Sequence, residues 1–194
     1  MLNWFSQSPQ SDSVVITGAS TGIGAACALA LDKLGYRVFA GVRHPADGER
    51  LQQQAGPRLM PIRLDVTDAA SISAASHTVA AMVGERGLAG LVNNAGIGVA
   101  GPIELLPLAD WRRQFEVNVF GLIAVTQTFL PLIRTGRGRI INMGSIAGRA
   151  SMPFMAPYAG SKHALEAITD ALRLALQPWG IRVALIAAGA IATP

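Results

Sequence analysis

Cysteine is almost absent from the 194-residue chain, which has only Cys27, and this excludes an internal disulfide. Cys27 lies within the apolar run A-A-C-A-L-A-L, which favours a small buried core residue over a reactive thiol. A chain without disulfides is compatible with a reducing compartment. We therefore expect a cytoplasmic protein.

Charged residues make up only 14% of the chain, whereas 51% of its residues are hydrophobic and its mean hydropathy is +0.37. This composition excludes an intrinsically disordered chain, and the length predicts a single domain. The net charge of +4 is spread along the sequence, except for the cluster R-T-G-R-G-R at positions 134–139. A solvated turn before a strand explains that cluster better than a nucleic-acid patch, so no nucleic-acid partner is expected.

Signals for export, membrane insertion and metal binding are also missing. Residues 1–12 have neither a basic start nor a sustained apolar run, so we interpret them as a polar tail before a domain at 13–194. No stretch reaches the roughly 18 apolar residues of a membrane-spanning helix, and no membrane partner is expected. His44, His77 and His163 have no metal-ligating companions, so we predict no metal site.

Short β-branched runs alternate with helical patterns along the whole domain. The expected strands are 14–17, 37–42, 59–64, 88–93, 139–143 and 181–187, and the expected helices are 22–34, 47–54, 68–83, 110–133 and 157–177. Several strands are almost entirely apolar, as parallel strands covered on both faces are. Repeated β–α units with right-handed crossovers predict a three-layer, Rossmann-type, doubly wound parallel α/β sheet of about six strands.

The first strand runs directly into the glycine-rich segment T-G-A-S-T-G-I-G at positions 17–24. Glycine permits the tight turn and lets a pyrophosphate approach the backbone, while the following helix offers unpaired N–H groups. This strand–loop–helix context predicts dinucleotide binding. The residues expected to contact the dinucleotide here are Gly18, Ser20, Gly22, Ile23 and Gly24.

The end of the second strand reads G-V-R-H, where NAD-binding proteins usually carry an acid for the adenosine ribose. Val42 cannot accept a hydrogen bond, whereas Arg43 is a cation suited to a 2′-phosphate. We therefore expect NADP(H) as the preferred cofactor, with NAD(H) possible. The alternative for Arg43 is an ordinary solvated charge at a strand end.

Tyr158 and Lys162 are four residues apart in a predicted helix, and Ser145 precedes Tyr158 by 158 − 145 = 13 positions. Positions i and i+4 share a helix face, and a fixed positive charge favours the ionised form of a nearby phenol. Such a phenol can exchange protons near neutral pH. Taken alone, the pair is also compatible with an ordinary polar pair on a helix surface.

Five motifs in fixed order resemble the short-chain dehydrogenase/reductase family in its single-domain branch. They are T-G-x-x-x-G-I-G at 17–24, N-N-A-G at 93–96, N-V-F-G at 118–121, Ser145, and Y-x-x-x-K at 158–162. The sequence around these motifs resembles, more weakly, the retinol- and hydroxysteroid-type members of the family. The resemblance implies an oxidoreductase that transfers a hydride between NADP(H) and an alcohol, ketone or aldehyde.

The resemblance also implies roles for four residues. Tyr158 would protonate the carbonyl oxygen in reduction and accept a proton in oxidation, and Lys162 would favour ionisation of that phenol and hold the nicotinamide ribose. Ser145 would donate a hydrogen bond to the substrate oxygen, and Asn118 would hold a water in a proton relay. The further cofactor-binding positions that it implies are Asp65, Val66, Asn93, Ala95, Gly96, Gly189, Ile191 and Thr193. Asn93, Ala95 and Gly96 would also buttress the sheet.

The chain departs from the family at its C-terminal end. Ala188-Gly189 stands where members commonly have Pro-Gly, and the helical lid and seventh strand that usually follow are not in this sequence. We therefore expect a sheet without the seventh strand and an open substrate pocket. A truncated dinucleotide-binding module with little or no catalysis is the alternative function.

The substrate is expected to be a small and rather apolar carbonyl or alcohol compound. Met152, Phe154 and Met155 lie between Ser145 and Tyr158, and they either line an apolar pocket or merely pack. The 157–177 helix has a second apolar stripe beyond the one that faces the sheet, which suggests a homo-oligomer. The residues of this stripe are Ala164, Ala167, Ala171, Leu174 and Ala175.

Overall fold

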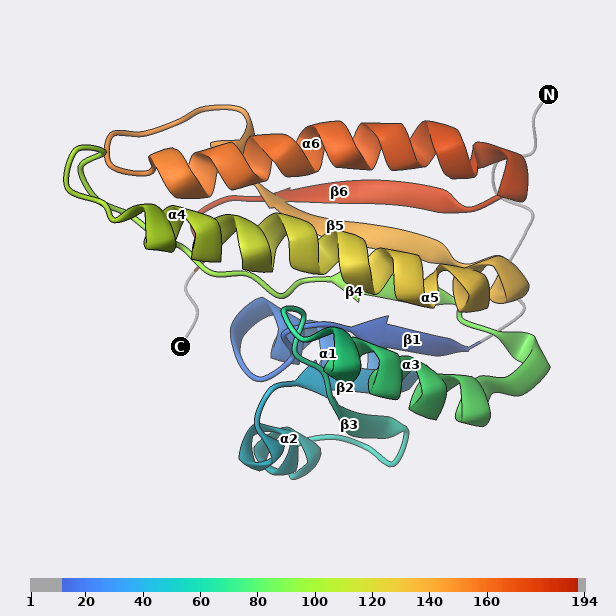
Figure 1. Ribbon diagram of the computed structural model, residues 1–194. Coiled ribbons are helices and arrows are strands. Elements are labelled where there is room, and N and C mark those ends of the chain that lie inside the picture. Colours follow the sequence, from blue (N-terminus) through green and yellow to red (C-terminus); the bar gives the residue numbers. More distant parts are fainter. Residues whose placement is uncertain (1–11, 192–194) are drawn as a thin grey trace.

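A six-stranded parallel sheet forms the middle layer of the computed structural model, which describes residues 12–191 (Figure 1). Its strands are β1 (Ser13–Ile16), β2 (Arg37–Val42), β3 (Leu59–Arg63), β4 (Gly90–Asn93), β5 (Arg139–Ser145) and β6 (Arg182–Ala188). The strand order is β3-β2-β1-β4-β5-β6, so the direction of winding reverses between β1 and β4. The predicted doubly wound α/β fold is therefore confirmed.

Helices cover the sheet in two layers. They are α1 (Gly22–Lys33), α2 (Pro45–Gln52), α3 (Ala69–Val83), α4 (Leu108–Phe115), α5 (Leu122–Gly136) and α6 (Ala156–Leu176). Helices α3, α5 and α6 lie on one face of the sheet (Figure 1). Their apolar side chains pack with Phe39, Leu91 and Ile140 in one buried cluster. Side chains of α1 and α2 pack with Ile16 and Val38 in a second cluster on the other face. Alternating strand side chains thus divide the core between the two faces.

Several predicted boundaries shift by a few residues. The second helix begins at Pro45 instead of 47, because proline at the first helical position needs no hydrogen-bonded N–H. The fifth strand runs on to include Ser145. Cys27, expected in the core, is only half-buried, and burial raises the pKa of its thiol. The predicted polar tail lies outside the described residues except for Asp12.

The predicted helix 110–133 differs most from the structure. It begins at Leu108, changes to a π-helical segment at Glu116–Gly121, here called η2, and continues as α5 to Gly136. By length and composition alone, the whole stretch Leu108–Gly136 is long and apolar enough to cross a membrane, contrary to the expectation from the sequence. Val125, Phe129 and Ile133 are fully buried in the core, and their packing accounts for the apolar composition.

Candidate active site

The glycine-rich loop between β1 and α1 has a backbone conformation that residues other than glycine rarely adopt. Gly18 and Gly22 have φ angles of +64° and +58°. A Cβ added at Gly24 would lie 2.2 Å from the Gly18 carbonyl oxygen and 2.4 Å from Asn94 Nδ2. The glycines therefore allow the loop to fold tightly over the start of α1, where helix N–H groups and the positive end of the helix dipole favour anions.

Asn94 and Thr17 join this loop to the chain that follows β4. Asn94 Nδ2 donates to the carbonyl oxygens of Thr17 and Gly18 at 3.0 and 2.9 Å. Thr17 Oγ1 accepts from the backbone N–H groups of Asn94 and Ala95, both at 3.0 Å. Asn94 was not among the predicted site residues, although the N-N-A-G motif contained it. It holds together the two loops at the point where the sheet reverses its winding.

A cleft of about 750 Å³ extends from the glycine-rich loop to the first turn of α6, along the carboxyl ends of the strands. Its volume falls in the range of about 300–1,000 Å³ that is usual for small-molecule sites. The predicted residues that line it are Gly18, Ser20, Gly22, Ile23, Gly24, Arg43, Asp65, Val66, Ala95, Gly96, Ser145, Tyr158, Lys162, Gly189 and Ile191. Asn93 and Asn118 are not in its lining, and Thr193 lies outside the described residues.

One end of the cleft carries opposite charges at the ends of β2 and β3. Arg43 is exposed and forms no ion pair with any carboxylate of residues 12–191. Asp65 Oδ1 accepts hydrogen bonds from Thr67 N at 2.9 Å and Thr67 Oγ1 at 2.8 Å. Desolvation acts to raise the pKa of Asp65, but these bonds and the charges of Arg43 and Arg63 outweigh it and leave that pKa below its usual value.

The other end of the cleft contains Tyr158 and Lys162, both from the first turns of α6. Lys162 is only 7% exposed, and its Nζ donates to the carbonyl oxygen of Met143 at 2.7 Å. Desolvation lowers the pKa of Lys162 from 10.5 to about 8. Its Nζ lies 5.6 Å from the centre of the Tyr158 ring. The pair therefore faces a cleft, and the alternative of an ordinary surface pair is excluded.

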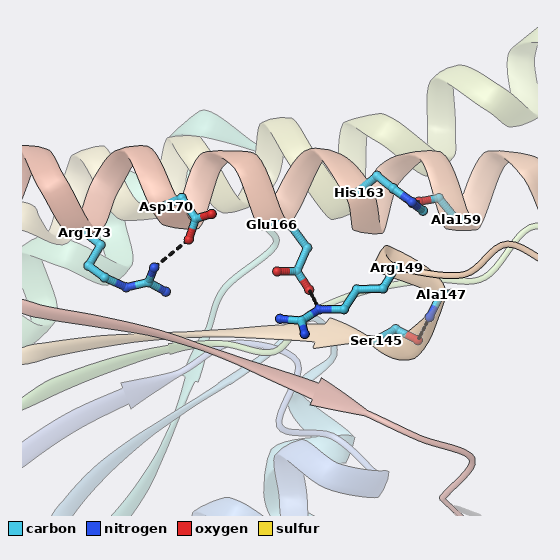
Figure 2. A network of polar contacts seen from close by, with 8 residues as sticks. All are labelled: Ser145, Ala147, Arg149, Ala159, His163, Glu166, Asp170 and Arg173. Atoms are coloured by element: carbon cyan, nitrogen blue, oxygen red, sulfur yellow. Dashed lines mark hydrogen bonds and ion pairs between the residues drawn. The ribbon is translucent and has the colours of Figure 1, made fainter.

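Ser145, the last residue of β5, is buried at the same end of the cleft. Its hydroxyl oxygen accepts a hydrogen bond from Ala147 N at 3.1 Å (Figure 2). This bond caps the start of a short 3₁₀ turn, Ile146–Gly148. Beyond the turn, Arg149 Nε donates to Glu166 Oε1 on α6 at 3.3 Å. A Cβ added at Gly148 would lie 2.9 Å from the Lys162 carbonyl oxygen. The turn after Ser145 therefore packs directly on the helix that carries Tyr158 and Lys162.

His163, beside Lys162 in sequence, does not belong to the cleft. Its side chain is exposed on α6, with Nδ1 2.9 Å from the Ala159 carbonyl oxygen (Figure 2). Among the described residues no three His, Cys, Asp or Glu side chains gather as a metal site requires. Of the three apolar candidates, Met152 and Met155 line the cleft, whereas Phe154 is not in its lining.

Asn118 and Asn93 are both buried behind the cleft wall. Asn118 accepts from Ile97 N at 2.9 Å and donates to the Ile97 carbonyl oxygen at 3.0 Å and to Ser161 Oγ at 3.1 Å. Its predicted part in a water relay stays a prediction. Asn93 Nδ2 donates to Thr126 Oγ1 and Asn142 Oδ1, at 3.0 and 2.9 Å.

These hydrogen bonds give Asn93 the sheet-supporting role that was expected of it, whereas its cofactor contact stays a prediction. Since Asn93 is the last residue of β4, its side chain points into the layer between the sheet and α5. Asn142 continues the chain of hydrogen bonds to Thr169 Oγ1 on α6 at 2.9 Å. The side chain of Asn93 thus joins the sheet to α5, and the lining of the cleft begins at Asn94.

The family model for short chain dehydrogenases matches residues 12–194 of this chain. Retinol dehydrogenase 5 of Mus musculus is 42% identical over 188 residues, which are 96% of this chain and 59% of that protein. The 17-beta-hydroxysteroid dehydrogenase type 2 of Homo sapiens is 41% identical over 183 residues, 93% of this chain and 47% of that protein. The chain therefore spans about half to three fifths of the length of these relatives.

Solved structures show the same fold. The 3-ketoacyl-(acyl-carrier-protein) reductase from Brucella melitensis, complexed with NADH, gives a TM-score of 0.88 at 29% identity over 94% of this chain and 77% of that chain. ElxO with NADP bound gives a TM-score of 0.87 at 27% identity over 93% of this chain and 74% of that chain. Similar folds thus hold either nicotinamide dinucleotide.

Proposed function

Because the chain belongs to the short-chain dehydrogenase family, we propose that it transfers a hydride between NADP(H) and a small alcohol, ketone or aldehyde. The observation that carries this proposal is one continuous cleft with a glycine-rich anion site at one end and the Tyr158–Lys162 pair beside Ser145 at the other. Such a cleft can hold the phosphates and the reacting carbon of one extended ligand at the same time.

The residues present fit a bound dinucleotide. A side chain at Gly18 or Gly24 would collide with Ala95 or with the Gly18 carbonyl oxygen, so glycine is needed for the loop to pack closely at the start of α1, whose N–H groups would bind a pyrophosphate. When bound, the nicotinamide supplies the hydride in reduction and accepts it in oxidation. The protein's own residues would orient the ligand and move the proton.

Proton transfer is proposed for Tyr158, whose hydroxyl hydrogen would pass to the carbonyl oxygen as the carbonyl carbon is reduced. Lys162 is buried beside the ring and held by the Met143 carbonyl oxygen, so its positive charge acts in a region poor in water. Ser145 Oγ accepts from Ala147 N, which leaves its own hydrogen available for a substrate oxygen. These positions support the roles that the resemblance implied.

Arg43 is the basis for proposing NADP(H) instead of NAD(H). It lines the cleft at the end of β2 without an ion-pair partner among the described residues, and the preceding Val42 offers no acceptor for a ribose hydroxyl. A guanidinium fork matches a 2′-phosphate in geometry and charge. The substrate is proposed to be apolar because Ile146, Met152 and Met155 line the cleft near Ser145.

Replacing Tyr158 by phenylalanine tests the proposed chemistry, because it removes the hydroxyl and little else. We expect NADPH-dependent reduction of apolar ketones and aldehydes to fall by about 100-fold or more, while NADPH binding measured by calorimetry is retained. The control is Tyr36→Phe, because Tyr36 is the other of the two tyrosines in the chain and packs, partly buried, against the core away from the cleft. Full turnover by the Tyr158→Phe protein would refute the assignment.

A further inference from the structure

Gln114 is fully buried in α4, and no motif in the sequence marks it as functional. Its Oε1 accepts from Val99 N at 2.6 Å, and its Nε2 donates to the Ile97 carbonyl oxygen at 2.8 Å. The same Nε2 lies 3.4 Å from Ser161 Oγ, at the long end of hydrogen bonding. One side chain therefore links the segment 97–99, which follows β4, to the first turns of α6.

Asn118 repeats this pattern four residues later. It also bonds both backbone groups of Ile97, and its Nδ2 donates to Ser161 Oγ at 3.1 Å. The π-helical segment η2 places Asn118 so that it reaches the same two partners as Gln114. Two buried amides, from neighbouring parts of one long helix, thus converge on the same loop residue and the same serine.

The Ser161 hydroxyl connects these two amides to the backbone of Tyr158. Its oxygen donates to the Tyr158 carbonyl oxygen at 2.7 Å. A hydroxyl has one hydrogen to donate, so Ser161 must accept from Gln114 and Asn118. The direction of all these bonds is therefore fixed, and both amides have one orientation that satisfies every partner.

The two segments held in this way lie beside each other in the lining of the cleft. Tyr158 lines it from α6, whereas Ile97 and Gly98 line it from the loop after β4. A Cβ added at Gly98 would lie 3.8 Å from Tyr158 Cδ2, which is ordinary van der Waals contact. The placement of the Tyr158 ring therefore depends on the separation between α6 and the loop.

We propose that Gln114 and Ser161 are positioning residues, which set the place of Tyr158 relative to the loop formed by residues 97–99. The inference rests on the proposed hydride-transfer function, because only that function gives the place of the phenol a chemical consequence. A displacement of about 1 Å at a reacting group costs about 100-fold in rate. Loss of either residue is therefore expected to lower kcat while the distant glycine-rich loop still binds the dinucleotide.

Gln114→Met and Ser161→Ala are the test variants, because each removes the hydrogen bonds with little change in shape. We expect kcat to fall by about 10- to 100-fold, with the Kd for NADPH changed less than twofold. Thr169→Val is the matched control, since Thr169 is equally buried on the same helix but bonds Asn142, away from the cleft. A similar loss of kcat in Thr169→Val would overturn the inference by showing that any buried hydroxyl on α6 matters equally.

A second readout does not depend on turnover. In a Tyr36→Phe background Tyr158 is the only tyrosine, so incorporated 3-fluorotyrosine gives one ¹⁹F resonance from its ring. We expect that resonance to shift or broaden in Gln114→Met and Ser161→Ala and to stay in place in Thr169→Val. An unchanged resonance in both test variants overturns the inference.

The two readouts separate the inference from the function on which it rests. If the wild-type protein reduces no carbonyl compound, the proposed function fails, and the ¹⁹F resonance alone decides whether Gln114 and Ser161 place the ring. If Gln114→Met does not fold, Ser161→Ala removes a single oxygen and still gives both readouts. Normal kcat with a displaced resonance would also overturn the inference, because the place of the ring would then have no consequence.

Discussion

Burial of the Lys162 ammonium has a measurable effect on stability. Desolvation lowers its pKa from 10.5 to about 8 in the folded protein. Each pKa unit corresponds to about 1.4 kcal/mol, so the charged form destabilises the folded state by about 3 kcal/mol relative to an exposed lysine. Because Lys162 is only 7% exposed, solvent screening reduces this effect little.

The sign of the pH dependence follows from the two pKa values. Below pH 8 the lysine is protonated in both states, and the full penalty is present. Between pH 8 and pH 10.5 the unfolded chain keeps a proton that the folded protein loses, so stability rises with pH. Relative to Lys162→Met, the cofactor-free wild type should gain about 1.4 kcal/mol per pH unit in this window.

Urea unfolding at pH 7, 8, 9 and 10 measures this gain as the difference between wild type and Lys162→Met. Lys33→Met is the matched control, because Lys33 is the other of the two lysines in the chain and lies exposed at the end of α1. We expect the wild type to differ from Lys33→Met by the same amount at every pH. A difference between wild type and Lys162→Met that does not change with pH would refute the reasoning.

Three further predictions concern the cofactor and the surface of α6. Arg43→Ala should raise the KM for NADPH by about 10-fold or more and leave that for NADH nearly unchanged, since only the 2′-phosphate loses its partner; a parallel change in both would contradict the assignment. Gly24→Ala should abolish dinucleotide binding in calorimetry, because its Cβ would lie 2.2 Å from a backbone oxygen. Gly90→Ala, whose Cβ would be no closer than 3.4 Å to any neighbour, should bind normally. Leu174, which is 72% exposed on α6, should lie in a homo-oligomer interface. Leu174→Arg should therefore lower the particle mass measured by light scattering, and a monomeric wild type at micromolar concentration would contradict this.

Local sequence patterns predicted the sheet and the two ends of the cleft well. Apolar strands, the glycine-rich turn and the Tyr158–Lys162 spacing each depend on a few neighbouring residues and one conformational rule. In a parallel sheet all carboxyl strand ends meet at one edge, so residues distant in sequence could be expected to lie together. Arg43, Asp65 and Ser145 all line that edge, as the order of the strands requires.

The residues that sequence reasoning missed depend on non-local packing. Asn93 and Asn94 are adjacent and chemically identical, and only the end of β4 decides that one supports the sheet while the other holds the glycine-rich loop. Gln114 is an ordinary helix former in the sequence. Its burial requires the loop at 97–99 to fold across α4, and the π-helical segment that aligns Asn118 has no simple sequence signal.

Stability and the proposed activity place opposite demands on position 162. Removing the ammonium relieves about 3 kcal/mol of desolvation at pH 7 and gives up a charged hydrogen bond to Met143, worth about 1.5–3 kcal/mol. Lys162→Met should therefore be as stable as the wild type at pH 7, or up to about 1.5 kcal/mol more stable, although it loses turnover. Urea unfolding at pH 7 and NADPH oxidation on the same preparations measure both quantities. If Lys162→Met were instead less stable by more than about 1 kcal/mol, the lysine would contribute to the fold, and its burial would need no catalytic reason.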